Sequence, residues 1–96
     1  MNRANIISAL QKYKQHSAEK YGILKLGVFG SAAIEQMTEN SDIDVIVDLQ
    51  EQDLFTLSGI KQDLEDYFHV KVDVISYRPR MDSFLKERID KEAVYV

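Results

Sequence analysis

Three aspartates in this chain occupy positions where carboxylates can act together on a charged substrate. Asp42 and Asp44 are separated by one residue in the segment SDIDVIVDL, and Asp73 lies inside a second apolar segment, VKVDVIS. Both segments alternate in the way that predicts β-strands. Side chains at positions i and i+2 of a strand point to the same face, with their Cα atoms about 6.5 to 7 Å apart. Two carboxylates placed in this way repel each other.

A lone Asp-x-Asp pair commonly belongs to a strand face that is simply exposed to solvent. Asp73 is the residue that favours a functional site instead. Aspartate is disfavoured inside strands, and charged side chains are rarely buried without a partner. Carboxylates that converge from neighbouring strands form an oxygen site suited to Mg²⁺, which keeps several waters and takes one or two carboxylates together with substrate phosphates. Asp42, Asp44 and Asp73 are therefore candidate metal ligands and catalytic residues.

The Gly30-Ser31 pair supplies the other half of such a site. It follows directly on the apolar segment that ends at Phe29. Glycine lets a backbone approach phosphate oxygens closely, and a serine can cap a following helix whose first amide groups attract anions. We therefore predict that Gly30 and Ser31 bind nucleotide phosphates.

Periodicity and capping residues predict the elements that position these groups. A first helix is expected from Asn2 to about Lys20 and ends before Gly22; a second runs from the cap Asp53 to about His69, with a buried stripe that begins at Leu54; a third runs from the cap Asp82 to about Lys91. Strands are expected over residues 24–29, 41–49 and 70–76. The closing segment AVYV can form a further short strand. A further short helix is expected just after Ser31. Strands that alternate with helices predict an α/β or α+β fold in two layers, with the helices on one face and the aspartates on a partly open face.

Length and composition restrict the function further. The 96 residues, of which 45% are hydrophobic and 29% charged, predict one folded domain over residues 1–96. A net charge of −4 with scattered basic residues argues against direct nucleic-acid binding. The absence of cysteine excludes disulfides, thiolate chemistry and Cys-type zinc sites. We see no signal peptide and no membrane-spanning segment, and we expect a cytoplasmic protein.

The segment GSAAIEQMTENSDIDV resembles the Gly-Ser…Asp-x-Asp motif of the nucleotidyltransferase superfamily, and the short chain resembles its minimal, MNT-type members. The Gly-Ser pair, the ten-residue spacer and the third in-strand aspartate all fall in register. This resemblance implies a small mixed sheet of the nucleotidyltransferase-like fold. It also implies that Gly30 and Ser31 contact the triphosphate of ATP, that Asp42 and Asp44 bind one or two Mg²⁺ ions, and that Asp73 is the third carboxylate and the candidate base.

The resemblance extends to partner and reaction. Many minimal members are antitoxins paired with HEPN-domain ribonuclease toxins, so the implied function is Mg²⁺-dependent transfer of AMP from ATP to a tyrosine hydroxyl of such a toxin, in a homo- or hetero-oligomer. The chain departs from the family where members commonly carry arginine and glycine, because Ile34 and Glu35 stand there. Losing a positive charge beside a triphosphate and gaining a negative one should weaken ATP binding.

Two alternatives therefore remain open at the level of sequence. One is a non-catalytic protein of the same fold that inhibits its partner toxin by stable binding, which the altered loop favours. The other is nucleotidyl transfer to a small molecule such as an aminoglycoside, for which the chain leaves little room for a second lobe.

Overall fold

A computed structural model of the chain describes residues 2–30, 33 and 42–96. In chain order these residues form α1 (Arg3–Tyr21), β1 (Ile23–Phe29), β2 (Ile43–Leu49), α2 (Leu54–Phe68), β3 (Val72–Ser76), α3 (Ser83–Glu92) and β4 (Val94–Tyr95). Each of these elements was predicted, with ends that differ by at most about two residues. The short helix expected after Ser31 lies outside the described residues.

The helix ends follow from local capping chemistry. The side chain of Asp53 accepts a hydrogen bond from the backbone N–H of Phe55 at the start of α2, over 2.8 Å. Asp82 does the same for Leu85 at the start of α3, over 3.0 Å. The helix α1 ends where Gly22 adopts φ of 67°, a conformation that glycine reaches without the steric penalty of a side chain. All three of these helix boundaries confirm the sequence prediction.

The four strands form one mixed sheet in the order β3-β2-β1-β4. β1 runs antiparallel to both β2 and β4, whereas β2 and β3 run parallel. Gly27 of β1 permits the pairing with β4, because a Cβ atom at this position would lie 2.5 Å from the carbonyl oxygen of Val94. The expected small mixed sheet is therefore confirmed.

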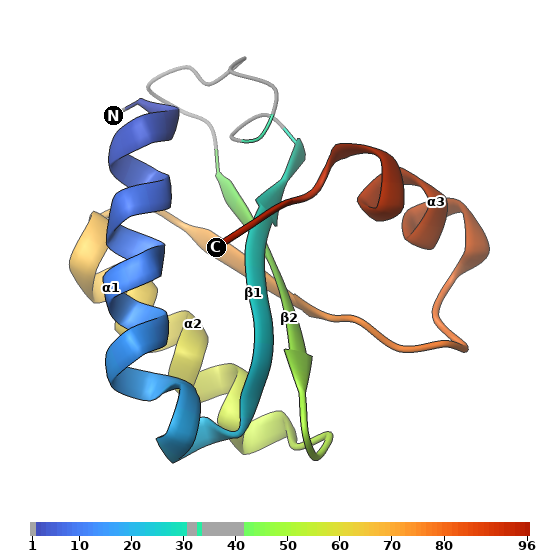
Figure 1. The fold of residues 1–96 in the computed structure, drawn as a ribbon, viewed down its shortest axis with the longest axis horizontal. Coiled ribbons are helices and arrows are strands. Elements are labelled where there is room, and N and C mark those ends of the chain that lie inside the picture. The colour runs from blue at the N-terminus through green and yellow to red at the C-terminus, as the bar shows by residue number, and fades with distance from the viewer. Residues whose placement is uncertain (1, 31–32, 34–41) are drawn as a thin grey trace.

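The helices occupy both faces of this sheet (Figure 1). α1 and α2 cover one face, and the main core lies between them and the inward side chains of the strands. α3 lies on the opposite face, where Ile89 is fully buried against Phe29 and Ile46. The expectation that all helices pack on one face is wrong for α3. Its own apolar stripe needs a surface to cover, and Phe29 and Ile46 offer one on the aspartate face.

α2 differs from prediction at its first turn and protects the edge of the sheet at β3. Leu54, expected to begin the buried stripe, is 82% exposed. At the edge strand β3, Lys61 Nζ donates to the carbonyl oxygen of Val72 over 2.7 Å, and Glu65 Oε2 accepts from the N–H of Val72 over 3.0 Å. Side chains of α2 therefore satisfy the backbone groups of Val72. Across the described residues, no helix is long and apolar enough to cross a membrane.

Candidate active site

Asp44 and Asp73 are direct neighbours in the sheet. They are register partners in the parallel pairing of β2 with β3, and adjacent strands lie about 4.8 Å apart. Register partners on parallel strands present their side chains to the same face. Asp42 lies one residue before β2 and is partly buried like the other two. The structure thus brings Asp44 and Asp73 together on one face of the sheet, with Asp42 close enough for its charge to act on Asp44.

The pKa of Asp44 reflects its burial and the charged side chains that lie close to it. The pKa of Asp44 is raised, first by burial and then by the charge of Asp73, with smaller contributions from Asp42 and Glu92. The guanidinium of Arg88 acts in the opposite direction and lowers this pKa. Negative charge is therefore concentrated around Asp44, in surroundings that favour the binding of a cation.

Gly30 closes the site at the end of β1. Its backbone adopts φ of 70°, in the left-handed region that favours glycine. A Cβ atom there would lie 2.5 Å from Asp44 Oδ2 and 3.3 Å from Arg88 Nη2. A side chain at position 30 would therefore collide with the Asp44 carboxylate and crowd the Arg88 guanidinium, so only glycine fits between them. Ser31, predicted to bind phosphate beside it, and the substituted positions Ile34 and Glu35 lie outside the described residues.

α3 contributes two charged side chains that the sequence analysis missed. Glu92 Oε2 accepts a hydrogen bond from the N–H of Gly30 over 3.3 Å, and a second from Arg88 Nε over 3.2 Å. The guanidinium carbon of Arg88 lies 5.8 Å from the ring centroid of Phe29. A sequence signal does exist, because Leu85, Arg88, Ile89 and Glu92 have the i, i+3, i+4, i+7 spacing of one helix face. Two charged residues at the spacing of the apolar face that covers the sheet are the signal that could have indicated them.

Asp44, Asp73 and Arg88 line a cavity of about 340 Å³. This volume lies near the lower end of the ~300–1,000 Å³ range of small-molecule sites. The cavity combines carboxylates, basic side chains and apolar walls. Its lining residues are Phe29, Asp44, Lys61, Asp73, Val74, Ile75, Leu85 and Arg88.

The donor set suits a metal ion that is shared with a substrate. Within the described part of the chain, no group of three or more His, Cys, Asp or Glu side chains is arranged to hold a metal ion by itself. Mg²⁺ does not need such a cage, because it usually takes one or two carboxylates and completes its shell with water and phosphate oxygens. The adjacent carboxylates of Asp44 and Asp73 fit that requirement.

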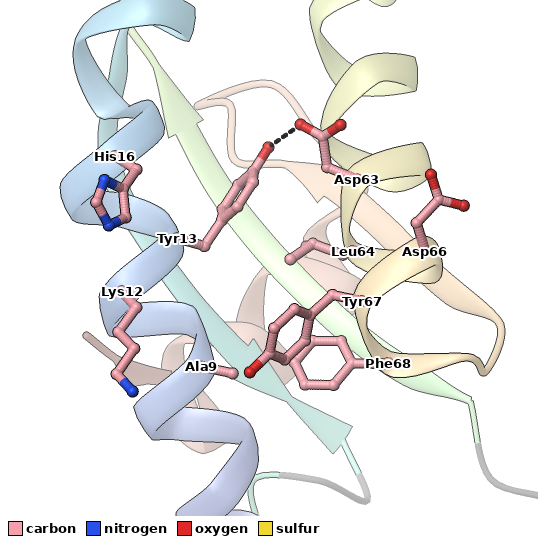
Figure 2. A pocket seen from close by; sticks show the side chains of 9 residues that line it. All are labelled: Ala9, Lys12, Tyr13, His16, Asp63, Leu64, Asp66, Tyr67 and Phe68. Carbon is pink, nitrogen blue, oxygen red and sulfur yellow. Dashed lines mark hydrogen bonds between the residues drawn. The ribbon is translucent and has the colours of Figure 1, made fainter.

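A second cavity, of about 320 Å³, lies between α1 and α2 on the other face of the sheet (Figure 2). Figure 2 shows Tyr13 extending from α1 toward Asp63 of α2, where its hydroxyl donates to Asp63 Oδ2 over 2.8 Å. Burial, and then this hydrogen bond, raise the pKa of Tyr13. The hydroxyl of Tyr21 also donates to Asp63, over 3.2 Å. These bonds connect the two helices, and the cavity is separated from the aspartates by the sheet.

A mixed sheet with in-register carboxylates beside a left-handed glycine defines a protein of the nucleotidyltransferase class. Residues 5–96 match the family described as polymerase beta, nucleotidyltransferase, and the chain belongs to this family. It is 32% identical over 94 residues to a candidate protein adenylyltransferase of Methanocaldococcus jannaschii, a match that covers 97% of this chain and 96% of that protein. It is 30% identical over 92 residues to the protein adenylyltransferase MntA of Thermococcus cleftensis, covering 95% and 92% of the two chains.

Solved structures show the same fold. A candidate minimal nucleotidyltransferase superposes with a TM-score of 0.80 at 28% identity, over 98% of this chain and 95% of that one. A toxin-antitoxin structure with AMP-PNP superposes with a TM-score of 0.75 at 21% identity, over 99% of this chain and 72% of that one. At the second identity the likeness concerns the fold alone.

Proposed function

We propose that this chain is a protein adenylyltransferase and an antitoxin, which transfers AMP from ATP to a tyrosine hydroxyl of a HEPN-domain partner toxin in a Mg²⁺-dependent reaction. The observation that carries the proposal is the in-register pair of Asp44 and Asp73 on one sheet face beside Gly30. Two relatives are 30 to 32% identical over nearly the whole chain and are named protein adenylyltransferases. Their names support a protein, rather than a small molecule, as the acceptor of AMP.

The proposed chemistry assigns a task to each of these groups. The tyrosine oxygen attacks the α-phosphorus of ATP, the bond from this phosphorus to the bridging oxygen breaks, and pyrophosphate leaves. Bound Mg²⁺ would neutralise the charge that builds up on the phosphates, with Asp44 and Asp73 as its protein ligands and Asp42 as a further carboxylate beside them. A tyrosine hydroxyl has an ordinary pKa near 10 and needs help to lose its proton at neutral pH. Asp73 is the candidate acceptor of that proton, and the N–H of Gly30, with Ser31, contacts the triphosphate.

The test is the transfer of label from ATP to the purified partner toxin. The toxin, ATP labelled at the α-phosphate and Mg²⁺ are incubated with the wild-type chain, with Asp44→Asn or with Asp73→Asn. We expect the wild type to increase the toxin mass by one or more AMP units and both variants to lose this transfer. Asp48→Asn is the matched control, because it removes a partly buried carboxylate from the same strand. Labelled toxin formed at the wild-type rate by the Asp44 and Asp73 variants would contradict the mechanism.

A second function, stable non-catalytic inhibition of the toxin, is favoured by one specific observation. The carboxylate of Glu92 already occupies the N–H of Gly30 that the first proposal assigns to the triphosphate. The sequence adds Glu35 where the family commonly has glycine. Under this alternative the toxin stays unmodified in a stable complex, and Asp44→Asn still neutralises it. Recovery of free, AMP-modified toxin would exclude the alternative.

A further inference from the structure

The loop after Gly30 lacks the basic residue that the family commonly places beside the triphosphate. Ile34 and Glu35 stand there instead, so a basic side chain that assists Mg²⁺ in binding the phosphates would come from another part of the chain. Of the basic side chains that line the aspartate cavity, Lys61 donates to the carbonyl oxygen of Val72 at the sheet edge, so it would have to give up a backbone partner to reach a phosphate. Arg88 is the other, and its guanidinium lies beside Asp44 and Gly30.

The contacts of Arg88 show how a phosphate would fit. Two donors, the Gly30 N–H and Arg88 Nε, converge on the same anionic oxygen, Glu92 Oε2. A phosphate oxygen takes the same donors, since backbone N–H groups and guanidinium groups both form charge-assisted hydrogen bonds to phosphates. The Glu92 carboxylate therefore stands in for a phosphate oxygen at this position. The side chain of Arg88 is 47% exposed, which leaves it access to a ligand that enters from solvent.

We propose that Arg88 of α3 binds the triphosphate of the nucleotide, and that the Glu92 carboxylate occupies the same donors until the phosphate displaces it. This inference rests on the proposed function, because it assumes a nucleoside triphosphate as the substrate. It makes Arg88 the replacement for the missing basic residue of the loop. It also makes Glu92 an internal competitor that weakens nucleotide binding.

The experiment measures binding rather than turnover. The probes are AMP-PNP with Mg²⁺, titrated calorimetrically, and inorganic triphosphate as a competitor. Because charge-assisted hydrogen bonds contribute roughly 1.5–3 kcal/mol, Arg88→Ala should weaken AMP-PNP binding about 10- to 150-fold. Arg88→Lys should recover only part of this loss, because lysine keeps the charge but not the planar fork. Glu92→Gln should bind AMP-PNP more tightly than the wild type.

Lys91→Ala is the matched control, since it removes one exposed positive charge from the same helix. We expect its affinity to stay within about twofold of the wild type, because an exposed charge contributes little. Inorganic triphosphate should compete with AMP-PNP at the wild type and much more weakly at Arg88→Ala. A purely structural role for Arg88 would not produce this change, and circular dichroism confirms that each variant is folded.

The outcomes separate this inference from the proposed function. If the wild type binds AMP-PNP and Arg88→Ala binds it equally well, Arg88 is not the phosphate ligand, although the adenylyltransferase proposal stands. If Glu92→Gln binds no more tightly than the wild type, displacement of Glu92 is refuted. If the wild type does not bind AMP-PNP, both proposals are wrong.

Discussion

Asp73→Asn is expected to stabilise the fold while it abolishes AMP transfer. The reason is the repulsion between Asp44 and Asp73, which are in-register neighbours on the same face. Two unit charges about 5 Å apart interact with about 3 kcal/mol at an effective dielectric constant of about 20. Both side chains are only partly buried and Arg88 lies nearby, so solvent screening reduces the expected gain to about 1 kcal/mol at pH 7.

The stabilisation expected from Asp73→Asn depends on pH, and the direction follows from the pKa of Asp44. Burial, followed by Asp73, raises the pKa of Asp44 above its ordinary value of 3.8. The folded state therefore binds the Asp44 proton more tightly than the unfolded state, and the contribution of Asp44 to stability falls as pH rises through the interval between the two values. The repulsion is therefore stronger at pH 7 than around pH 4, where protonation of Asp44 relieves part of it. The advantage of Asp73→Asn over the wild type should be larger at pH 7 than at pH 4.

Urea unfolding of wild type and variant at both pH values, followed by circular dichroism, measures this difference. Asp48→Asn serves as the control and is expected to change the free energy of unfolding by less than about 0.5 kcal/mol, as is usual for substitutions away from specific contacts. The reasoning is refuted if Asp73→Asn is less stable than the wild type at pH 7. It is equally refuted if the gain is the same at both pH values.

Three further substitutions test other contacts of the fold. Gly30→Ala should destabilise the fold by about 1–3 kcal/mol, because alanine strains the left-handed backbone. It should also abolish nucleotide binding, because its Cβ would collide with the Asp44 carboxylate. An unchanged urea midpoint and an unchanged AMP-PNP affinity would contradict this. Gly27→Ala should lower the free energy of unfolding by about 1–3 kcal/mol, because its Cβ would push Val94 away. Hydrogen exchange should then show lost protection of the β4 amides, and retained protection would count against this prediction. Asp63→Ala should lower the free energy of unfolding by about 1 kcal/mol by removing the acceptor of Tyr13, with AMP-PNP affinity unchanged, and loss of that affinity would show that the two cavities are coupled.

Local chemistry explains why so much of the fold could be predicted from sequence. The helix boundaries at Gly22, Asp53 and Asp82 depend on contacts with residues a few positions away, which a sequence displays directly. The strand parity that puts Asp44 and Asp73 on one face depends only on alternation. Their meeting across two strands depends in addition on the parallel register of β2 and β3, which no local sequence pattern encodes.

The errors arise where packing between distant segments decides. The pattern of α3 shows an apolar stripe but does not say which sheet face it covers, and this choice brings Arg88 and Glu92 to the site. Leu54 has the spacing of a buried residue, yet it lies in the first turn of α2, where the helix extends beyond the core. Sequence reasoning therefore singled out the aspartates of the candidate site and missed the two charged residues of α3, Arg88 and Glu92.

The capping of Val72 by Lys61 and Glu65 has a consequence for how this chain meets other proteins. An uncovered edge strand invites another polypeptide to extend the sheet by strand addition, which can lead to aggregation. With both backbone groups of Val72 already bonded to α2, an incoming strand finds no free donor or acceptor at that residue. Recognition at this end of β3 must then depend on side-chain chemistry, which discriminates between partners in a way that main-chain pairing does not.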